Sequence, residues 1–286
     1  MRERVGRVGV VTGAAGGIGY GIAQAPAGEG MRVVLADRDA ARVEEAAALL
    51  GAEGAEVLAV PTDVRDAAAV EALADAARAR FGRVDVVCNN AGVWTLNRQW
   101  ETELVDWQWV VDVNLWGVVH GVRTFVPLML AQPEGGHIVN TASMGGLIGG
   151  AMTGPYGATK HAIVGLAKGL RAELAGTAVG VSLLCPGKVR SEMLDRVNAR
   201  PAADAGDETP GDDGPTSSAR DVIDAMRRSQ AGGDERPGGR RAGRCGDPRK
   251  QVLGAAGRRR PHAFVAGGVR RADRRVRIDA GRPVSP

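Results

Sequence analysis

Residues 12–19 read TGAAGGIG, and they lie between a short apolar run at residues 7–12 and an alanine-rich stretch typical of a helix. The apolar run suits a buried parallel strand. Gly13, Gly17 and Gly19 let the backbone turn tightly and approach a pyrophosphate closely, while the start of the helix supplies amide donors. A glycine-rich loop between a strand and a helix therefore predicts the first unit of a dinucleotide-binding fold.

Strand and helix patterns alternate along the next 165 or so residues. The expected strands are residues 32–36, 55–60, 84–88, 137–141 and 180–185, and the expected helices are 40–50, 66–81, a long helix within 103–129, and 156–175. We expect Pro26 to kink or end the first helix, and Asp66 to cap the third. The alternation predicts the fold class: α/β, a doubly wound Rossmann-type parallel sheet in a single domain, with an atypical C-terminal tail.

Polar or turn-forming residues follow the expected strands, so we expect them to meet at one edge of the sheet. Asp37 follows the second strand, where an acidic residue holds the adenosine ribose hydroxyls. Its charge would repel a 2′-phosphate, which favours NAD over NADP, although Arg38 beside it weakens that preference. The alternative is that Asp37 only caps the following helix. Asp63 follows the third strand and is a candidate contact for the adenine.

Tyr156 and Lys160 lie one helical turn apart on the same face. An ammonium group beside a tyrosine favours the phenolate and lowers the tyrosine pKa from about 10, so that it can act as a general acid or base. Ser143, thirteen residues upstream, could hydrogen-bond the same substrate oxygen. The alternative is an ordinary solvated pair on a helix surface. Asn114 lies within the long helix, where it either bonds a neighbouring main chain or holds a water in a proton relay.

Together these residues resemble the short-chain dehydrogenase/reductase family over residues 6–195. The resemblance implies that Tyr156 is the general acid/base, that Lys160 lowers its pKa and holds the nicotinamide ribose, and that Ser143 positions the substrate oxygen. It implies that Asn114 completes a proton relay. The matching residues, in the order and spacing of the family, are Thr12-Gly13-x-x-x-Gly17-Ile18-Gly19, Asp63-Val64, Asn89-Asn90-Ala91-Gly92, Asn114, Ser143, Tyr156-x-x-x-Lys160 and Pro186-Gly187-x-Val189-x-Ser191.

The resemblance also implies a set of cofactor-binding residues for NAD, with NADP the less favoured cofactor. Ser191 occupies the place of the usual threonine that contacts the carboxamide. The set is Gly13, Gly17, Ile18, Gly19, Asp37, Asp63, Val64, Asn90, Tyr156, Lys160, Pro186, Val189 and Ser191.

Apolar residues after the strands suggest the substrate class. With Ser143, the candidate substrate residues are Trp94 and Met144, and further apolar candidates are Leu147, Met152, Met193 and Leu194. They indicate a pocket for a bulky hydrophobic secondary alcohol or ketone that could be cyclic, such as a terpenoid-, steroid- or aromatic-like molecule; the alternative is ordinary loop packing. Other functions remain open: an NADPH-dependent ketone reductase, a non-catalytic dinucleotide-binding regulator, or nucleic-acid binding through the tail.

Composition bears on where the protein resides and on which kinds of site it can contain. The chain has 286 residues, of which 44% are apolar, with no apolar run of about eighteen residues and no signal-peptide pattern. We therefore expect a cytoplasmic protein that does not bind membranes. The three cysteines have no metal-like spacing, so we expect reduced thiols and no metal site.

Charge is distributed unevenly along the chain. Residues 220–286 hold 18 Lys and Arg against 7 Asp and Glu, while the whole chain carries a formal charge of only +4. The main domain is therefore net negative, and nucleic-acid binding by it is not expected.

Three segments are expected along the chain. Residues 1–198 form the catalytic domain, 199–229 a lid or linker with a short helix, and 230–286 an Arg/Gly-rich, poorly ordered tail. The tail could instead bind polyanions, form an irregular cap, or be the product of a shifted reading frame. The family normally has a seventh strand in this region, often used in subunit contacts, and its members suggest a homodimer or homotetramer.

Overall fold

The computed structural model describes residues 4–187 together with 189, 193, 197, 221 and 224. Most of the expected lid or linker and all of the Arg/Gly-rich tail lie outside the described residues. Among individual candidates, Ser191, Leu194 and Cys245 lie outside them as well. The expected division of the chain after residue 198 therefore stays a prediction.

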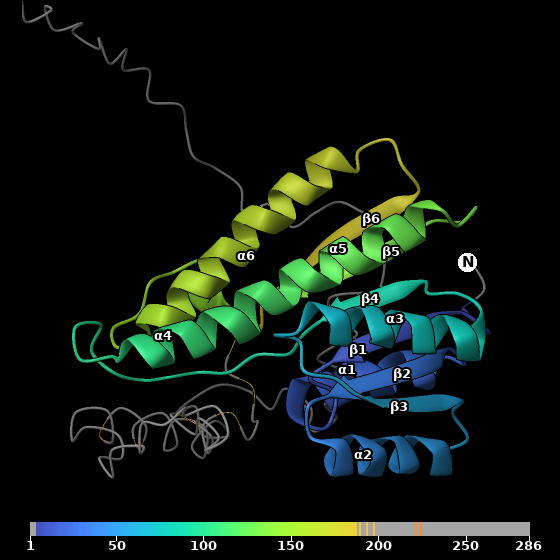
Figure 1. Cartoon of the computed structure of the whole chain (residues 1–286), viewed down its shortest axis with the longest axis horizontal. Coiled ribbons are helices and arrows are strands. Elements are labelled where there is room, and N and C mark those ends of the chain that lie inside the picture. Colours follow the sequence, from blue (N-terminus) through green and yellow to red (C-terminus); the bar gives the residue numbers. More distant parts are fainter. Residues whose placement is uncertain are drawn as a thin grey trace, which may run out of the picture.

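Six strands form one parallel sheet in the order β3-β2-β1-β4-β5-β6, as expected for a doubly wound fold (Figure 1). The strand order reverses between β1 and β4, which places a crevice outside the carboxyl ends of these two strands. The strands are β1 (Val8–Thr12), β2 (Arg32–Asp37), β3 (Val57–Pro61), β4 (Val86–Asn89), β5 (Gly136–Thr141) and β6 (Val179–Leu184).

Helices cover both faces of the sheet, because each face is apolar and must be buried. One core joins the sheet to α3, α4, α5 and the end of α6, and the other joins it to α1 and α2. The helices are α1 (Gly17–Ala27), α2 (Ala40–Ala52), α3 (Ala67–Phe81), α4 (Leu104–Val111), α5 (Gly117–Leu130) and α6 (Gly154–Glu173), with a π-helical turn η1 (Asp112–Trp116) and a 3₁₀ turn η2 (Met144–Gly146).

Local residues set where several helices begin and end. Asp66 caps α3 by accepting a hydrogen bond from the amide of Ala68 at 2.8 Å, as expected. Gly82 ends the same helix in the left-handed conformation, at φ +80°. Pro26 lies in the last turn of α1, which ends one residue later, so the expectation that it would end the helix is confirmed.

Several elements begin at residues other than the expected ones. Strand β4 begins two residues late because the amide and carbonyl of Val84 bond the side chain of Gln132, at 3.0 and 2.8 Å. Strand β3 also begins two residues late, at Val57. Helix α6 begins two residues early, with Pro155 in its first turn, where a missing amide hydrogen costs little.

The long helix expected within residues 103–129 is present but not uniform. Figure 1 shows α4, η1 and α5 as one continuous rod, in which the π-helical turn replaces the α-helix at Asp112–Trp116. By length and composition this rod, Leu104–Leu130, could cross a membrane. The sequence analysis expected no such segment. A core helix passes the same test, and here the rod packs against α3, α6 and the sheet.

Candidate active site

The glycine-rich loop after β1 is packed so closely that side chains could not fit. Gly13 has φ +65°, and a Cβ on it would lie 2.8 Å from the Cα of Ala91. A Cβ on Gly19 would overlap the carbonyl oxygen of Gly13. Gly17 also has a positive φ, of +53°, at the start of α1. This bare backbone at a helix N-terminus fits the pyrophosphate of a dinucleotide.

The loops after β1 and β4 are bonded to each other at the strand-order reversal. Thr12 Oγ1 accepts hydrogen bonds from the amides of Asn90 and Ala91, at 3.0 and 3.1 Å. The Asn90 side-chain amide donates to the Thr12 carbonyl at 3.0 Å. The sequence analysis assigned a role to Asn90 but none to the Thr12 hydroxyl. The position of Thr12 directly before the glycine-rich loop could have indicated that its hydroxyl joins the two loops.

Asp37 faces the glycine-rich loop. Its carboxylate accepts a hydrogen bond from the amide of Ala15 and another from the amide of Asp39, both at 3.2 Å. The cap of α2 is Asp39, which accepts from the amide of Arg42 at 3.1 Å. The alternative that Asp37 only caps the following helix is therefore wrong.

Asp63 is held by a neighbour that the sequence did not single out. Arg65 donates to it from its amide at 3.0 Å and from its guanidinium at 2.6 and 3.0 Å. Burial alone would raise the pKa of Asp63, but the hydrogen bonds from Arg65 and the charges of Arg65 and Arg38 outweigh it, so the pKa is lowered. Asp63 therefore stays ionised at the edge of the sheet.

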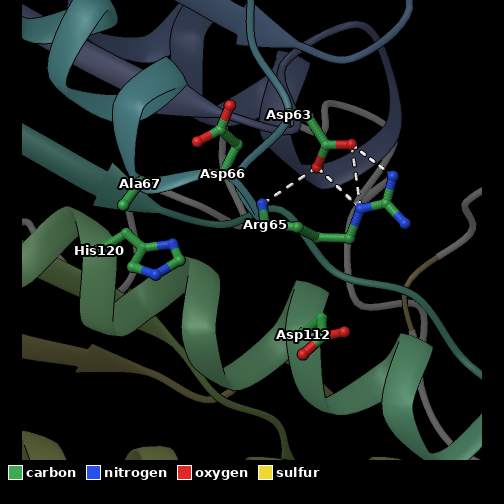
Figure 2. A pocket seen from close by; sticks show the side chains of 6 residues that line it. All are labelled: Asp63, Arg65, Asp66, Ala67, Asp112 and His120. Carbon is green, nitrogen blue, oxygen red and sulfur yellow. Dashed lines mark hydrogen bonds and ion pairs between the residues drawn. The ribbon is translucent and has the colours of Figure 1, made fainter.

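A surface pocket of about 440 Å³ lies beside this ion pair, between the start of α3 and the rod of α4 and α5 (Figure 2). His120 Nδ1 lies 2.9 Å from the carbonyl of Val64, so that nitrogen carries the proton. Val64 itself is buried. The pocket is lined by Asp63, Arg65, Asp66, Ala67, Asp112 and His120.

Tyr156 and Ser143 come together although Tyr156 lies in α6 and Ser143 lies in the loop after β5. The Ser143 side chain lies close enough to Tyr156 to influence the tyrosine pKa, and Ser143 Oγ accepts a hydrogen bond from the amide of Gly145 at 3.0 Å. The Trp94 ring packs on the Tyr156 ring with 5.5 Å between their centres. Burial raises the pKa of Tyr156, and Ser143 lowers it in part.

Lys160 is almost completely buried, with only 3% of its surface exposed. Its Nζ donates to the carbonyl of Thr141 at 3.0 Å and lies 5.6 Å from the centre of the Tyr156 ring. Burial lowers the Lys160 pKa to about 8. The expectation that Lys160 lowers the pKa of Tyr156 is not met, because the ammonium faces the tyrosine ring and a carbonyl, and burial is the largest influence on the tyrosine.

Asn114 lies in the π-helical turn and is fully buried. Its side chain donates to the carbonyl of Val93 and accepts from the Val93 amide, at 3.0 and 2.8 Å, and it donates to Thr159 Oγ1 at 3.2 Å. A Cβ on Gly92 would lie 3.3 Å from Asn114 Oδ1 and 3.4 Å from Lys160 Nζ. Asn114 and Lys160 therefore border the same glycine.

Exposed apolar side chains follow Ser143 in the chain. Met144, Leu147 and Ile148 in the segment after Ser143 are 42%, 50% and 63% exposed. The same segment is tied to the next loop, since the Met144 amide donates to the carbonyl of Pro186 at 3.0 Å. The remaining cofactor candidates, Ile18 and Val189, are partly buried.

Two further observations concern a buried cysteine and the grouping of possible metal ligands in the described part of the chain. Burial raises the pKa of the Cys88 thiol to about 12, as befits an inert core residue. Among these residues no three His, Cys, Asp or Glu side chains gather so that they could hold a metal ion.

Comparison with known proteins identifies the family. The model of short chain dehydrogenases matches residues 7–202, more than half of the sequence. The chain belongs to the short-chain dehydrogenase family. As a member of this family it is an oxidoreductase that acts on a CH–OH group.

Relatives of this short-chain dehydrogenase include enzymes and solved structures. It is 47% identical over 186 residues, or 64% of this chain and 69% of the relative, to 1-deoxy-11-beta-hydroxypentalenate dehydrogenase from Streptomyces avermitilis. It is 36% identical over 203 residues, or 71% and 67%, to C alpha-dehydrogenase from a Sphingobium species. A Burkholderia phymatum short-chain dehydrogenase/reductase, solved in complex with NAD, shares 43% identity with a TM-score of 0.76 over 82% of this chain and 83% of that one.

Proposed function

We propose that this protein is an NAD-dependent dehydrogenase that interconverts a secondary alcohol and a ketone on a hydrophobic, cyclic, terpenoid-like substrate. The observation that carries the proposal is the placement of Ser143 and buried Lys160 beside Tyr156. The exposed apolar residues Met144, Leu147 and Ile148 follow Ser143 in the chain. The name of the pentalenate relative supports the substrate class.

Bound NAD supplies the hydride acceptor, and the protein supplies proton transfer and orientation. In its phenolate form Tyr156 takes the alcohol proton during oxidation, and in its hydroxyl form it gives a proton to the ketone oxygen during reduction. Ser143 Oγ holds the substrate oxygen beside it. Lys160 contributes positive charge within 5.6 Å of the tyrosine ring. Asn114 keeps the loop at Val93 in place and, with Lys160 across Gly92, borders a path for the proton to leave.

The binding of NAD is supported by the fit of the loop and by Asp37. The bare glycine backbone suits the pyrophosphate, and the Asp37 carboxylate at the loop suits a ribose with free hydroxyls. Asp63 is proposed to contact the adenine. The NADPH-dependent reductase is the competing assignment, and the intact Ser143, Tyr156 and Lys160 set argues against a non-catalytic regulator.

Self-association as a homodimer or homotetramer is also proposed, through the outer face of the rod formed by α4 and α5. Trp116 is 46% exposed on this face, and Leu104 and Leu130 are exposed near its two ends. Asp112 lies five residues before the middle of the rod at Gly117, and Arg123 lies six residues after it. Antiparallel packing of two copies would therefore bring each Arg123 beside the Asp112 of the other copy. Trp116→Arg should halve the particle mass in sedimentation velocity.

The deciding experiment measures NADH formation from NAD with a panel of cyclic secondary alcohols. Tyr156→Phe should lower kcat by about 10²–10⁴-fold, because it removes the general acid/base. The Kd of this variant for NADH, measured by fluorescence, should stay within a few-fold of the wild-type Kd. Tyr20→Phe is the matched control, since Tyr20 is the only other tyrosine in the chain. Equal turnover in Tyr156→Phe and wild type would refute the mechanism.

A further inference from the structure

Trp94 packs directly on the ring of Tyr156. The two ring centres lie 5.5 Å apart and the ring planes are inclined by 38°, within the range of geometries in which aromatic pairs attract each other. The indole Nε1 of Trp94 is buried and has no hydrogen-bond partner among the residues that the structure describes. The link between the two residues is therefore a ring contact and not a hydrogen bond.

The backbone on both sides of Trp94 is anchored. The preceding residue, Val93, exchanges two hydrogen bonds with the buried side chain of Asn114, at 2.8 and 3.0 Å. Three residues after Trp94, the amide of Asn97 donates to the carbonyl of Met152 at 3.0 Å, two residues before α6 begins. The loop after β4 is thus bonded to the segment that leads into the helix of the tyrosine.

The polar and titratable groups around Tyr156 come from several elements of the described chain. On α6, the Lys160 ammonium lies 5.6 Å from the ring centre. From the loop after β5, the Ser143 side chain lowers the tyrosine pKa, and the Cys185 thiol just after β6 acts on Lys160. Trp94 comes from the loop after β4 and carries no charge, so it acts by filling space and excluding water.

We propose that Trp94 is a positioning residue for the reaction, whose ring holds the Tyr156 ring in place and shields it from water. The inference rests on the proposed function, in which Tyr156 transfers the proton. An indole and an ammonium border the tyrosine ring, and each is fixed by its own neighbours. A tyrosine held in this way keeps one orientation toward the substrate oxygen, and a small displacement of a catalytic group slows a reaction strongly.

The same contact bears on the protonation of Tyr156. Burial is the largest influence on this tyrosine and raises its pKa, because a buried phenolate is poorly hydrated. In Trp94→Leu water can approach the ring, so the phenolate titration midpoint should move to lower pH. Trp94→Phe keeps an aromatic ring against the tyrosine and should stay close to wild type.

Phenolate titration tests the inference without any substrate. Absorbance is followed against pH in a Tyr20→Phe background, in which Tyr156 is the only tyrosine. Trp94→Leu should lower the midpoint, whereas Trp94→Phe and Trp109→Leu should leave it unchanged. Trp109 is the matched control, because it lies in α4 and its Nε1 is also buried without a partner among the described residues. Circular dichroism shows whether each variant is folded at each pH, and Trp94→Met takes the place of Trp94→Leu if that variant does not fold.

Turnover separates positioning of the tyrosine from contact with the substrate. With NAD and an alcohol that wild type oxidises, Trp94→Leu should lower the limiting kcat at high pH by about tenfold or more, with KM changed less than about threefold. The midpoint of kcat against pH should move to lower pH in the same variant. A higher KM with an unchanged kcat and pH profile would overturn the inference, because Trp94 would then contact only the substrate.

The titration gives two further outcomes that would overturn it. One is an unchanged midpoint in folded Trp94→Leu, and the other is an equal shift in Trp94→Phe. Wild type that oxidises none of the alcohols would refute the proposed function, and the titration would still decide whether Trp94 shields Tyr156.

Discussion

Lys160 Nζ lies 5.6 Å from the centre of the Tyr156 ring, and it gives its hydrogen bond to the carbonyl of Thr141. The ammonium therefore faces the tyrosine ring and not its hydroxyl. Burial, which raises the pKa, is the largest influence on Tyr156, and Ser143 opposes it. Tyr156 is thus protonated at neutral pH and can act as an acid.

This relationship predicts the titration of Tyr156. The chain has two tyrosines, so phenolate absorbance in Tyr20→Phe reports Tyr156 alone. We expect its midpoint in the protein without added cofactor to lie above the ordinary tyrosine pKa of 10.0, because the phenolate is poorly solvated in the site. Tyr156→Phe supplies the baseline. A midpoint below that value would show that the charge of Lys160 outweighs burial after all.

Lys160 should make stability depend on pH. Its pKa in the fold is about 8, against an ordinary value of 10.5. Between these values the folded protein has lost the proton while the unfolded chain still holds it, so stability rises with pH through this window. Relative to Lys160→Met, wild type should gain at most about 3 kcal/mol from pH 7.5 to pH 10.5.

Urea unfolding at several pH values measures that difference, and comparing two variants cancels the groups that they share. Lys168→Met, at an exposed position on the same helix, controls for the general loss of a lysine. A difference between wild type and Lys160→Met that stays constant over the window would contradict the expectation.

Gly121 should tolerate no side chain. A Cβ there would overlap Oδ1 of Asn89, whose side-chain amide donates to Asn140 at 2.9 Å across β4 and β5. Gly121→Ala should lower the free energy of unfolding by about 2–4 kcal/mol, from overpacking and loss of this buried bond. Gly165→Ala on α6 has open space around it and should be neutral or stabilising by up to about 1 kcal/mol. Similar unfolding midpoints for the two variants would show that α5 can move away from Asn89 without loss of stability.

Asp85 should matter for stability and not for cofactor binding. It is buried at the amino end of β4, away from the site, and bonds Arg7 at 2.6 Å, Arg83 at 2.6 Å and the Val8 amide at 2.9 Å. Asp85→Ala takes the acceptor away from the Val8 amide and removes one of the two carboxylates that pair with Arg7 and Arg83, so it should cost about 3 kcal/mol. Asp75→Ala, which breaks an exposed pair with Arg78, should cost less than about 1 kcal/mol.

Thermal unfolding and the Kd for NADH separate the two effects of Asp85→Ala. A lower midpoint with unchanged binding is the expected result. A much higher Kd for NADH in protein that is still folded would mean that residues at the amino edge of the sheet affect cofactor binding.

The sequence by itself determined the fold class and the family. Apolar runs followed by turn residues fix a parallel sheet, because the carboxyl ends of such strands must lie at one edge. The glycine-rich loop and the cap at Asp66 are also local features, since backbone freedom and capping depend on a few neighbouring residues. For that reason Pro26 could be placed correctly at the end of α1.

Only the tertiary structure decided where charges and hydrogen bonds act. Periodicity put Tyr156 and Lys160 on one face, but burial and the carbonyl of Thr141 decided what Lys160 does. Nothing local indicated that Trp94 would pack on the Tyr156 ring. A pKa or a salt bridge depends on distances between distant parts of the chain, and sequence spacing does not contain those distances.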